Sequence, residues 1–281
     1  MITPTTITEQ LLFTTVRIET DRGVGTGFFF EARVDESKSL PLIVTNKHVV
    51  EKTTKGVFRL HEADRNADPP KPAGRFFSVL LDEFESWWIG HPEPGVDLCA
   101  MPCRPLFRHA EELGKTVFSK MFDESLILRD DQLANLSTAE DVLLVGYPIG
   151  LWDEKNNLPL IRRGITASHP ALDFNGKPEF VIDAACFPGS SGSPVVLANL
   201  GSYYSKDGAI VVGTRFALLG VLHGAPQMTV EGFPKMEPIP TAVVPAWEMR
   251  MVIHLGYVIK AKEIVTLAKH IVQKVQEMSL L

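Results

Sequence analysis

The stretch Gly189-Ser190-Ser191-Gly192-Ser193-Pro194, about two thirds of the way along the chain, carries most of what the sequence indicates. It places serines on a tight loop flanked by glycines. Such a loop lets a hydroxyl stand out while backbone N–H groups turn toward the same point. Acyl transfer needs this combination of an attacking hydroxyl and donors for the oxyanion that forms. The stretch therefore predicts a serine nucleophile, which we assign to Ser191.

A nucleophilic serine needs a general base, and the base needs a carboxylate that orients it. His48 lies in TNKHVV, which directly follows the apolar segment 41–44. We expect that segment to be a strand that holds His48 at its end, with the ring free. Asp97 begins another apolar segment, where it can be partly shielded. A carboxylate that accepts the N–H of the imidazole fixes its tautomer and stabilises the imidazolium. We predict His48, Asp97 and Ser191, in that chain order, as catalytic residues.

Composition and charge bound the class of protein. The 281 residues are 45% hydrophobic and 22% charged, which is ordinary for a globular protein and long enough for one large domain or two small ones. The net charge of −6 provides no basic field for nucleic acid, and no apolar run reaches membrane-spanning length. Residues 1–10 lack the basic and apolar regions of a signal peptide. We expect no nucleic-acid or membrane partner.

The cysteines indicate the compartment. Cys99, Cys103 and Cys186 are too few and too unevenly spaced for a disulfide framework, which favours a reducing cytosol. The pair Cys99 and Cys103 lacks the partner ligands of a structural zinc site. We therefore expect a cytoplasmic location, no metal and no cofactor.

Short apolar runs separated by glycine and proline predict a mainly β protein. The segment 62–74 is polar and rich in proline, which indicates an exposed hairpin loop, and the polar segment 121–140 is a connection between two halves. The predicted strands lie at residues 11–20, 25–30, 40–44, 57–60, 76–81, 87–89, 142–145, 180–182, 194–197, 209–212, 216–222 and 241–244.

The tail at residues 260–278 has a different pattern. Its apolar residues recur at helical spacing, which predicts an amphipathic helix. We expect this helix to pack on its own domain, the alternative being a surface for a partner or an oligomer. The apolar positions are Ile264, Leu267, Ala268, Ile271, Val272, Val275 and Met278.

The chain resembles the trypsin-like, or chymotrypsin-fold, serine peptidases in three motifs that occur in the order His, Asp, Ser. The motifs are TNKHVV, VDL and GSSGSP. The resemblance covers roughly residues 8–255. GTGF at 25–28 looks like the glycine-rich strand before the histidine, and VGYPIG at 145–150 with GITA at 164–167 resembles second-barrel strands of bacterial members. Asp183-Ala184-Ala185 resembles the HtrA (Deg) branch, without room for its PDZ domains, and GVLHG at 220–224 looks like the strand that pairs with substrate.

The resemblance implies an all-β fold of two six-stranded antiparallel barrels with the active site between them. The first barrel, 8–120, would carry His48 and Asp97, and the second, 121–255, would carry Ser191. Residues 256–281 would form a helical tail, and the three parts together would make one peptidase domain. The backbone N–H groups of Gly189 and Ser191 would form the oxyanion hole.

Two departures from the family concern activation and substrate specificity. Secreted members have an acid before the nucleophile, which pairs with the new N-terminus after cleavage, and this chain has Ser190 there. Tryptic pockets have an acid six positions before the nucleophile, where this chain has Ala185, so we expect a small or medium apolar P1 residue rather than Arg or Lys. The candidate substrate-binding residues are Ala185, Phe187, Leu222, His223 and Gly224.

Other functions fit the sequence less well than that of a serine endopeptidase. His223 lies one position later than the histidine of glutamyl endopeptidases, and one residue reverses the face of a strand, so acidic specificity stays an alternative. An α/β-hydrolase would need glycine where Ser193 stands, and alternating strands and helices. A peptidase fold kept as a binding or regulatory module would usually lose one of the three catalytic candidates, which are all retained here. A third hypothesis is a peptidase that stays inactive until a protein partner acts. The sequence leaves the protein or peptide substrate and the oligomeric state open.

Overall fold

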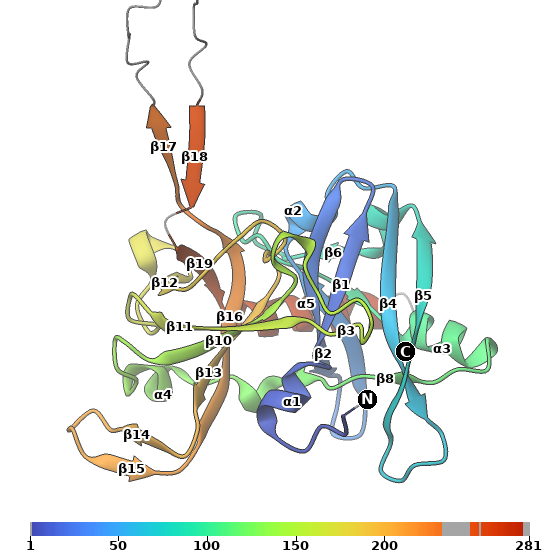
Figure 1. Ribbon diagram of the computed structural model, residues 1–281, viewed down its shortest axis with the longest axis horizontal. Coiled ribbons are helices and arrows are strands. Elements are labelled where there is room, and N and C mark those ends of the chain that lie inside the picture. Colours follow the sequence, from blue (N-terminus) through green and yellow to red (C-terminus); the bar gives the residue numbers. More distant parts are fainter. Residues whose placement is uncertain (1, 232–247, 253, 278–281) are drawn as a thin grey trace, which may run out of the picture.

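Two antiparallel β units, side by side, form the body of the protein (Figure 1). The computed structural model describes residues 2–231, 248–252 and 254–277. Apolar runs rich in β-branched and aromatic residues form the strands, and glycine and proline lie in the turns between them. The predicted all-β class is confirmed. Within the described ranges, every helix is too short or too polar to cross a membrane.

The first unit is a nine-stranded sheet with the main order β5-β4-β1-β2-β3-β7-β6, to which β8 and β9 are added at β4 and β2. Three of these strands, β6, β8 and β9, have only two residues each. Five of the strands predicted for this unit correspond to β1 to β5, whereas the strand predicted at 87–89 overlaps only the short β6 and β7 was not predicted. The order of this sheet is open, whereas the resemblance implied a closed six-stranded barrel. The strands are β1 Thr15–Thr20, β2 Gly23–Arg33, β3 Ser39–Thr45, β4 Lys55–Asp64, β5 Lys71–Asp82, β6 Ile89–Gly90, β7 Cys99–Pro102, β8 Val117–Phe118 and β9 Phe122–Asp123.

The second unit is a closed six-stranded barrel in the order β10-β11-β12-β19-β16-β13, as predicted. Its last strand, β19, lies within the segment 256–281 that the sequence assigned to a tail, apart from its first residue. The helical part of that tail therefore begins after the barrel has closed. The strands are β10 Asp141–Gly146, β11 Leu160–Thr166, β12 Glu179–Asp183, β13 Pro194–Asn199, β16 Arg215–Gly224 and β19 Leu255–Lys260.

Two hairpins project from the second unit (Figure 1). They are β14 Ser202–Tyr204 with β15 Ile210–Val212, and β17 Gln227–Glu231 with β18 Glu248–Val252. The hairpin predicted around 62–74 is formed by β4 and β5, whereas the strand predicted at 241–244 lies outside the described residues. The helices are α1 Ile7–Leu11, α2 Lys47–Val50, α3 Arg104–Glu112, α4 Asp130–Ala134 and α5 Lys262–Glu277, with short 3-10 turns η1 Phe84–Trp87, η2 Glu124–Leu126, η3 Pro148–Gly150 and η4 Phe174–Gly176.

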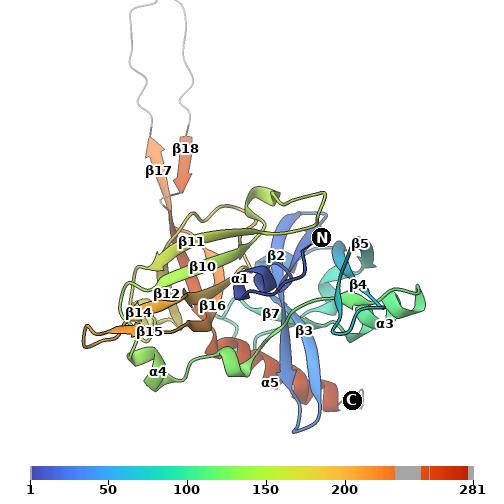
Figure 2. The same cartoon turned by 60° about the horizontal axis from the view of Figure 1, so that its bottom comes forward.

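The C-terminal helix α5 packs on both units. Figure 2 shows it running below them, from the second unit toward β3. One apolar cluster contains the buried face of α5 together with Phe30 and Leu42 of the first unit and Val196 and Leu218 of the second. The predicted helix is confirmed over Lys262–Glu277, and its apolar face is used within the chain, whereas the predicted Met278 lies outside the described residues. The buried residues of α5 are Ile264, Leu267, Ala268, Ile271, Val272 and Val275.

Candidate active site

The histidine and the aspartate are held by neighbouring segments of the first unit. β3 ends at Thr45, and Asn46 leads into α2, which carries His48. The buried side-chain amide of Asn46 donates to the backbone carbonyl of Asp97, at 2.8 Å. The ammonium group of Lys47 lies 3.4 Å from the carbonyl oxygens of Glu93 and Pro94 in the same loop. The loop before β7 is thereby fixed against α2.

His48 and Asp97 make a close pair. The ring Nδ1 of His48 lies 2.6 Å from Oδ2 of Asp97, and the backbone N–H of His48 donates to Oδ1 at 3.2 Å. Since an ionised carboxylate only accepts hydrogen bonds, this contact places the ring proton on Nδ1 and leaves Nε2 as an acceptor. The histidine side chain is 46% exposed, so solvent or a substrate can reach it. The structure thus brings these two predicted residues together as expected.

The loop with Ser191 lies between β12 and β13 and needs glycine at two positions. Gly189 and Gly192 both have φ of +84°, a region that other residues avoid. A Cβ on Gly192 would lie 1.9 Å from the backbone oxygen of Thr26, so no side chain fits there. The N–H of Gly192 donates to the carbonyl of Leu222 on β16, at 2.8 Å. These constraints fix a tight turn with Ser191 at its centre.

The carbonyl groups of this loop orient two N–H groups. Ile149 donates its N–H to the carbonyl of Pro188 at 2.5 Å, and Ser193 donates to that of Ser190 at 3.0 Å. In a trans peptide the N–H points away from the carbonyl, so the N–H groups of Gly189 and Ser191 face the opposite side. Neither donates to any described residue. Two backbone donors beside a serine hydroxyl form a site that favours a developing oxyanion.

A pocket of about 320 Å³ opens beside Ser191. Three of the predicted substrate-binding residues, Phe187, Leu222 and Gly224, line it. The sequence did not indicate the other lining residues, Cys186, Pro188 and Ala225, because the path of the loop across the barrel decides them. Among the described residues that line this pocket, none has a charged side chain.

Ala185 and His223 are not among the described residues that line this pocket, and their part in substrate binding stays a prediction. The carbonyl of Ala185 accepts a hydrogen bond from Arg162, which turns this residue toward β11. His223 lies between Leu222 and Gly224 on β16, where the strand carries a bulge. Its Nε2 lies 3.3 Å from Oε1 of Glu179. Burial lowers the pKa of His223, against the opposing effect of the Glu179 and Asp97 carboxylates.

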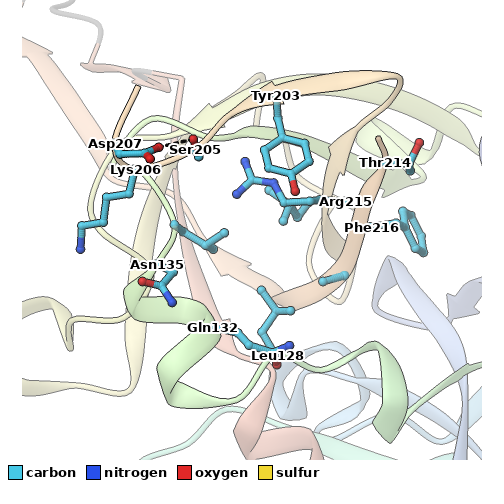
Figure 3. Close-up of a pocket in the computed structure, with 13 residues that line it drawn as sticks. Leu128, Gln132, Asn135, Tyr203, Ser205, Lys206, Asp207, Thr214, Arg215 and Phe216 are labelled. Atoms are coloured by element: carbon cyan, nitrogen blue, oxygen red, sulfur yellow. Dashed lines mark hydrogen bonds between the residues drawn. The ribbon is translucent and has the colours of Figure 1, made fainter. Parts of the chain in front are cut away.

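A larger pocket, of about 630 Å³, lies on the second unit near α4 and β14 (Figure 3). The guanidinium of Arg215 lies 3.9 Å from the ring centre of Tyr203 and 2.7 Å from the Glu140 carboxylate. The charge of Arg215 is therefore balanced within the chain. None of the predicted catalytic residues is among the described residues that line this pocket.

The cysteine thiols do not form a metal centre. Cys99, Cys103 and Cys186 are all buried and unpaired. Burial raises the pKa of the Cys186 thiol to about 11 and that of Cys99 well above its ordinary value, so both stay protonated. In the part of the chain that the structure describes, no three His, Cys, Asp or Glu side chains are grouped so as to hold a metal ion.

The comparisons with known proteins agree with this fold. The model of the trypsin-like peptidase domain matches residues 25–202, which is more than half of the chain. The chain therefore belongs to the trypsin-like peptidase domain family. No curated protein matches the sequence.

Solved structures of serine proteases match the chain at low sequence identity and with TM-scores below 0.5. Rv3671c protease from M. tuberculosis, in an inactive form, is 18% identical, with 94% of this chain and 91% of that chain covered and a TM-score of 0.43. The HtrA-type protease AlgW, with a decapeptide, is 14% identical, with coverages of 94% and 64% and a TM-score of 0.45. The thermostable serine protease AL20, from an extremophilic microorganism, is 11% identical, with coverages of 94% and 98% and a TM-score of 0.44.

Proposed function

We propose that the protein is a serine endopeptidase with His48, Asp97 and Ser191 as its catalytic residues. The observation that carries this proposal is the 2.6 Å contact between His48 Nδ1 and Asp97 Oδ2, in a chain of the trypsin-like peptidase family. The contact leaves Nε2 of an exposed imidazole free to accept a proton. The conformation of the Ser191 loop, with two N–H groups turned to one side, supports the same assignment.

The proposed reaction follows from these groups. The Oγ of Ser191 attacks the carbonyl carbon of a peptide bond while Nε2 of His48 takes the hydroxyl proton. Asp97 keeps the ring oriented and stabilises the imidazolium that forms. The N–H groups of Gly189 and Ser191 bind the oxyanion of the tetrahedral intermediate. His48 then gives the proton to the leaving amine, and water, activated by His48, releases the acyl group from Ser191.

The pocket beside Ser191 supports an apolar P1 residue of small or medium size. It has about 320 Å³, and its described lining residues include the apolar Phe187 and Leu222 beside Ser191. Because no acidic residue is among the described residues that line it, Arg or Lys at P1 would have no charge partner there. Acidic P1 would need a cation, and no arginine or lysine is among the described residues that line the pocket. Apolar P1 is therefore the better supported specificity.

We also propose that activation requires no cleavage of the chain, because Ser190 replaces the acid that would pair with a new N-terminus. The Ser190 side chain is buried, and its backbone N–H donates to the carbonyl of Phe187 at 3.0 Å. A cytoplasmic location is a further proposal, supported by three buried cysteines that are all free. Activation by a protein partner stays a hypothesis for experiment.

Mapping of new protein termini tests the proposed function. A denatured cell proteome is incubated with the wild type or with Ser191→Ala, with and without native lysate, and new N-termini are identified by mass spectrometry. We expect cleavages after small or medium apolar residues in the wild-type samples alone. No Ser191-dependent cleavage under any condition would reject the peptidase in favour of a binding module. Predominant Glu or Asp at P1 would reject the proposed specificity, and cleavage only with lysate would establish an activating partner.

A further inference from the structure

A buried threonine connects the two halves of the candidate site. Thr26 lies on β2 in the first unit and is 0% exposed. Its hydroxyl accepts a hydrogen bond from the N–H of Tyr147 at 3.2 Å and donates to the carbonyl of Gly189 at 3.0 Å. Its backbone N–H donates to the carbonyl of Ser191 at 2.9 Å. Thr26 therefore holds the nucleophile loop of the second unit from the side that carries His48 and Asp97.

The hydroxyl of Thr26 contacts Gly189, a residue whose backbone conformation is not restricted by a side chain. Glycine reaches many backbone conformations at similar energy, so its neighbours decide which one it takes. For Gly189, the preceding carbonyl, of Pro188, is held by the N–H of Ile149, and its own carbonyl is held by Thr26. Together these two hydrogen bonds fix both peptide planes beside Gly189. Its N–H is thereby kept on the side opposite to the Pro188 carbonyl.

We propose that Thr26 is a positioning residue, whose hydroxyl keeps the N–H of Gly189 directed at the oxyanion during catalysis. The inference rests on the proposed peptidase function. The hydroxyl contacts no reacting atom and acts only through Gly189. Because Tyr147 belongs to the turn that precedes Ile149, one hydroxyl links both segments that hold the oxyanion donor.

Substitutions at Thr26 distinguish the role of its hydroxyl from the roles of its backbone and side-chain shape. In Thr26→Val the backbone hydrogen bond to Ser191 is retained and the side chain keeps its shape, but the buried N–H of Tyr147 and the partly buried carbonyl of Gly189 lose their partner. An unpaired, partly buried carbonyl is costly, so the Gly189 peptide is expected to rotate toward another donor. In Thr26→Ser both hydrogen bonds can form again. Thr26→Cys has a weaker donor and acceptor at the same place.

A matched control exists in the second unit. Thr166, on β11, is 1% exposed, and its hydroxyl accepts from the N–H of Glu140 at 2.9 Å and donates to the carbonyl of Thr138. Thr166→Val therefore removes a buried hydroxyl of the same hydrogen-bonding pattern. The segment that it holds, between α4 and β10, does not include the Ser191 loop.

The test compares kcat and KM of these variants on a peptide that the wild type cleaves, with the active sites counted by a titrant. Loss of one oxyanion donor costs roughly 10²–10³ in kcat. We expect Thr26→Val to lose about tenfold or more in kcat, up to that limit, with little change in KM. Thr26→Ser should keep most of the wild-type kcat, with Thr26→Cys between the two. Thr166→Val should keep its kcat per active site, although it unfolds at a lower temperature.

Equal kcat values per active site for Thr26→Val and Thr166→Val would overturn the proposal, since the hydroxyl would then serve stability alone. If the valine variant does not fold, the order of kcat from threonine through serine to cysteine decides, and equal values for serine and cysteine would overturn it. A wild type that cleaves no peptide and reacts with no serine-directed probe would instead refute the proposed peptidase function. The two failures are thus distinguishable.

Discussion

Replacement of Asp97 by asparagine tests the role of the carboxylate beside His48. Asp97 accepts from the backbone N–H of His48 at 3.2 Å and faces Nδ1 of the ring at 2.6 Å. In Asp97→Asn, the amide oxygen is expected to keep the backbone hydrogen bond, so the NH₂ group faces the ring. It would then donate to Nδ1 and move the ring proton to Nε2, which could no longer accept the proton of Ser191.

The expected loss can be estimated from this geometry. The wrong tautomer costs about 10⁴ in kcat in this chemistry, or about 5 kcal/mol of barrier. The Asp97 side chain is 28% exposed, so water can compensate for a part of the loss, and we expect roughly 10³–10⁴. Single-turnover acylation of a peptide ester by wild type and variant measures the change, and circular dichroism with thermal unfolding checks that the variant is folded. A variant within tenfold of the wild type would refute the proposed role of Asp97.

Three further predictions concern the loop, the helix and a buried histidine. Gly192→Ala adds a Cβ 1.9 Å from the Thr26 oxygen, at a φ that costs alanine about 1–2 kcal/mol. We therefore expect a lower midpoint of urea unfolding and no reaction of Ser191 with a serine-directed probe. Normal labelling would contradict this expectation. Leu267→Ala, in the buried face of α5, should destabilise the protein by about 2–5 kcal/mol in urea unfolding, and a change below about 1 kcal/mol would show that α5 is not part of the core. Burial lowers the pKa of His61 from 6.5 to about 4, so the unfolded chain binds a proton that the folded one does not, and stability should fall by about 3 kcal/mol as the pH drops from 6.5 to 4. His61→Phe, which keeps an aromatic ring against Phe13, should reduce that slope, and an unchanged slope would exclude His61 as its source.

The parts of the site that follow from local sequence could be predicted. His48 follows a strand, Asp97 precedes one, and Ser191 lies between two glycines, so short segments fix the chemistry of each residue. The contact between His48 and Asp97 spans 49 positions, and it was inferred because the general base of such a reaction needs a carboxylate.

Contacts between distant segments could not be predicted in this way. The hydroxyl of Thr26 meets Gly189 across 163 positions and Tyr147 across 121, and no periodicity in the sequence encodes either distance. The faces of β16 also needed the structure, because whether Leu222 or His223 points to the pocket depends on the register of a strand that carries a bulge.

The C-terminal helix α5 was also predictable from its local pattern, whereas its packing was not. Helical spacing of apolar residues predicted α5 closely, since the pattern is set within the helix itself. The pattern did not indicate that the helix would contact both units, because an apolar face is compatible with many partners. That contact depends on the way in which the two units meet.

Labelling with a fluorophosphonate probe tests the central claim most directly. The wild type, Ser191→Ala and the control Ser190→Ala are treated with the probe, and the modified residue is identified by peptide mass mapping. Ser190 is an adjacent serine that is 1% exposed, so its variant should retain labelling. The proposed function predicts modification at Ser191 in the wild type and in Ser190→Ala, and none in Ser191→Ala. Labelling of Ser191→Ala at the wild-type rate, or of another residue in the wild type, would contradict the assignment of Ser191 as the nucleophile.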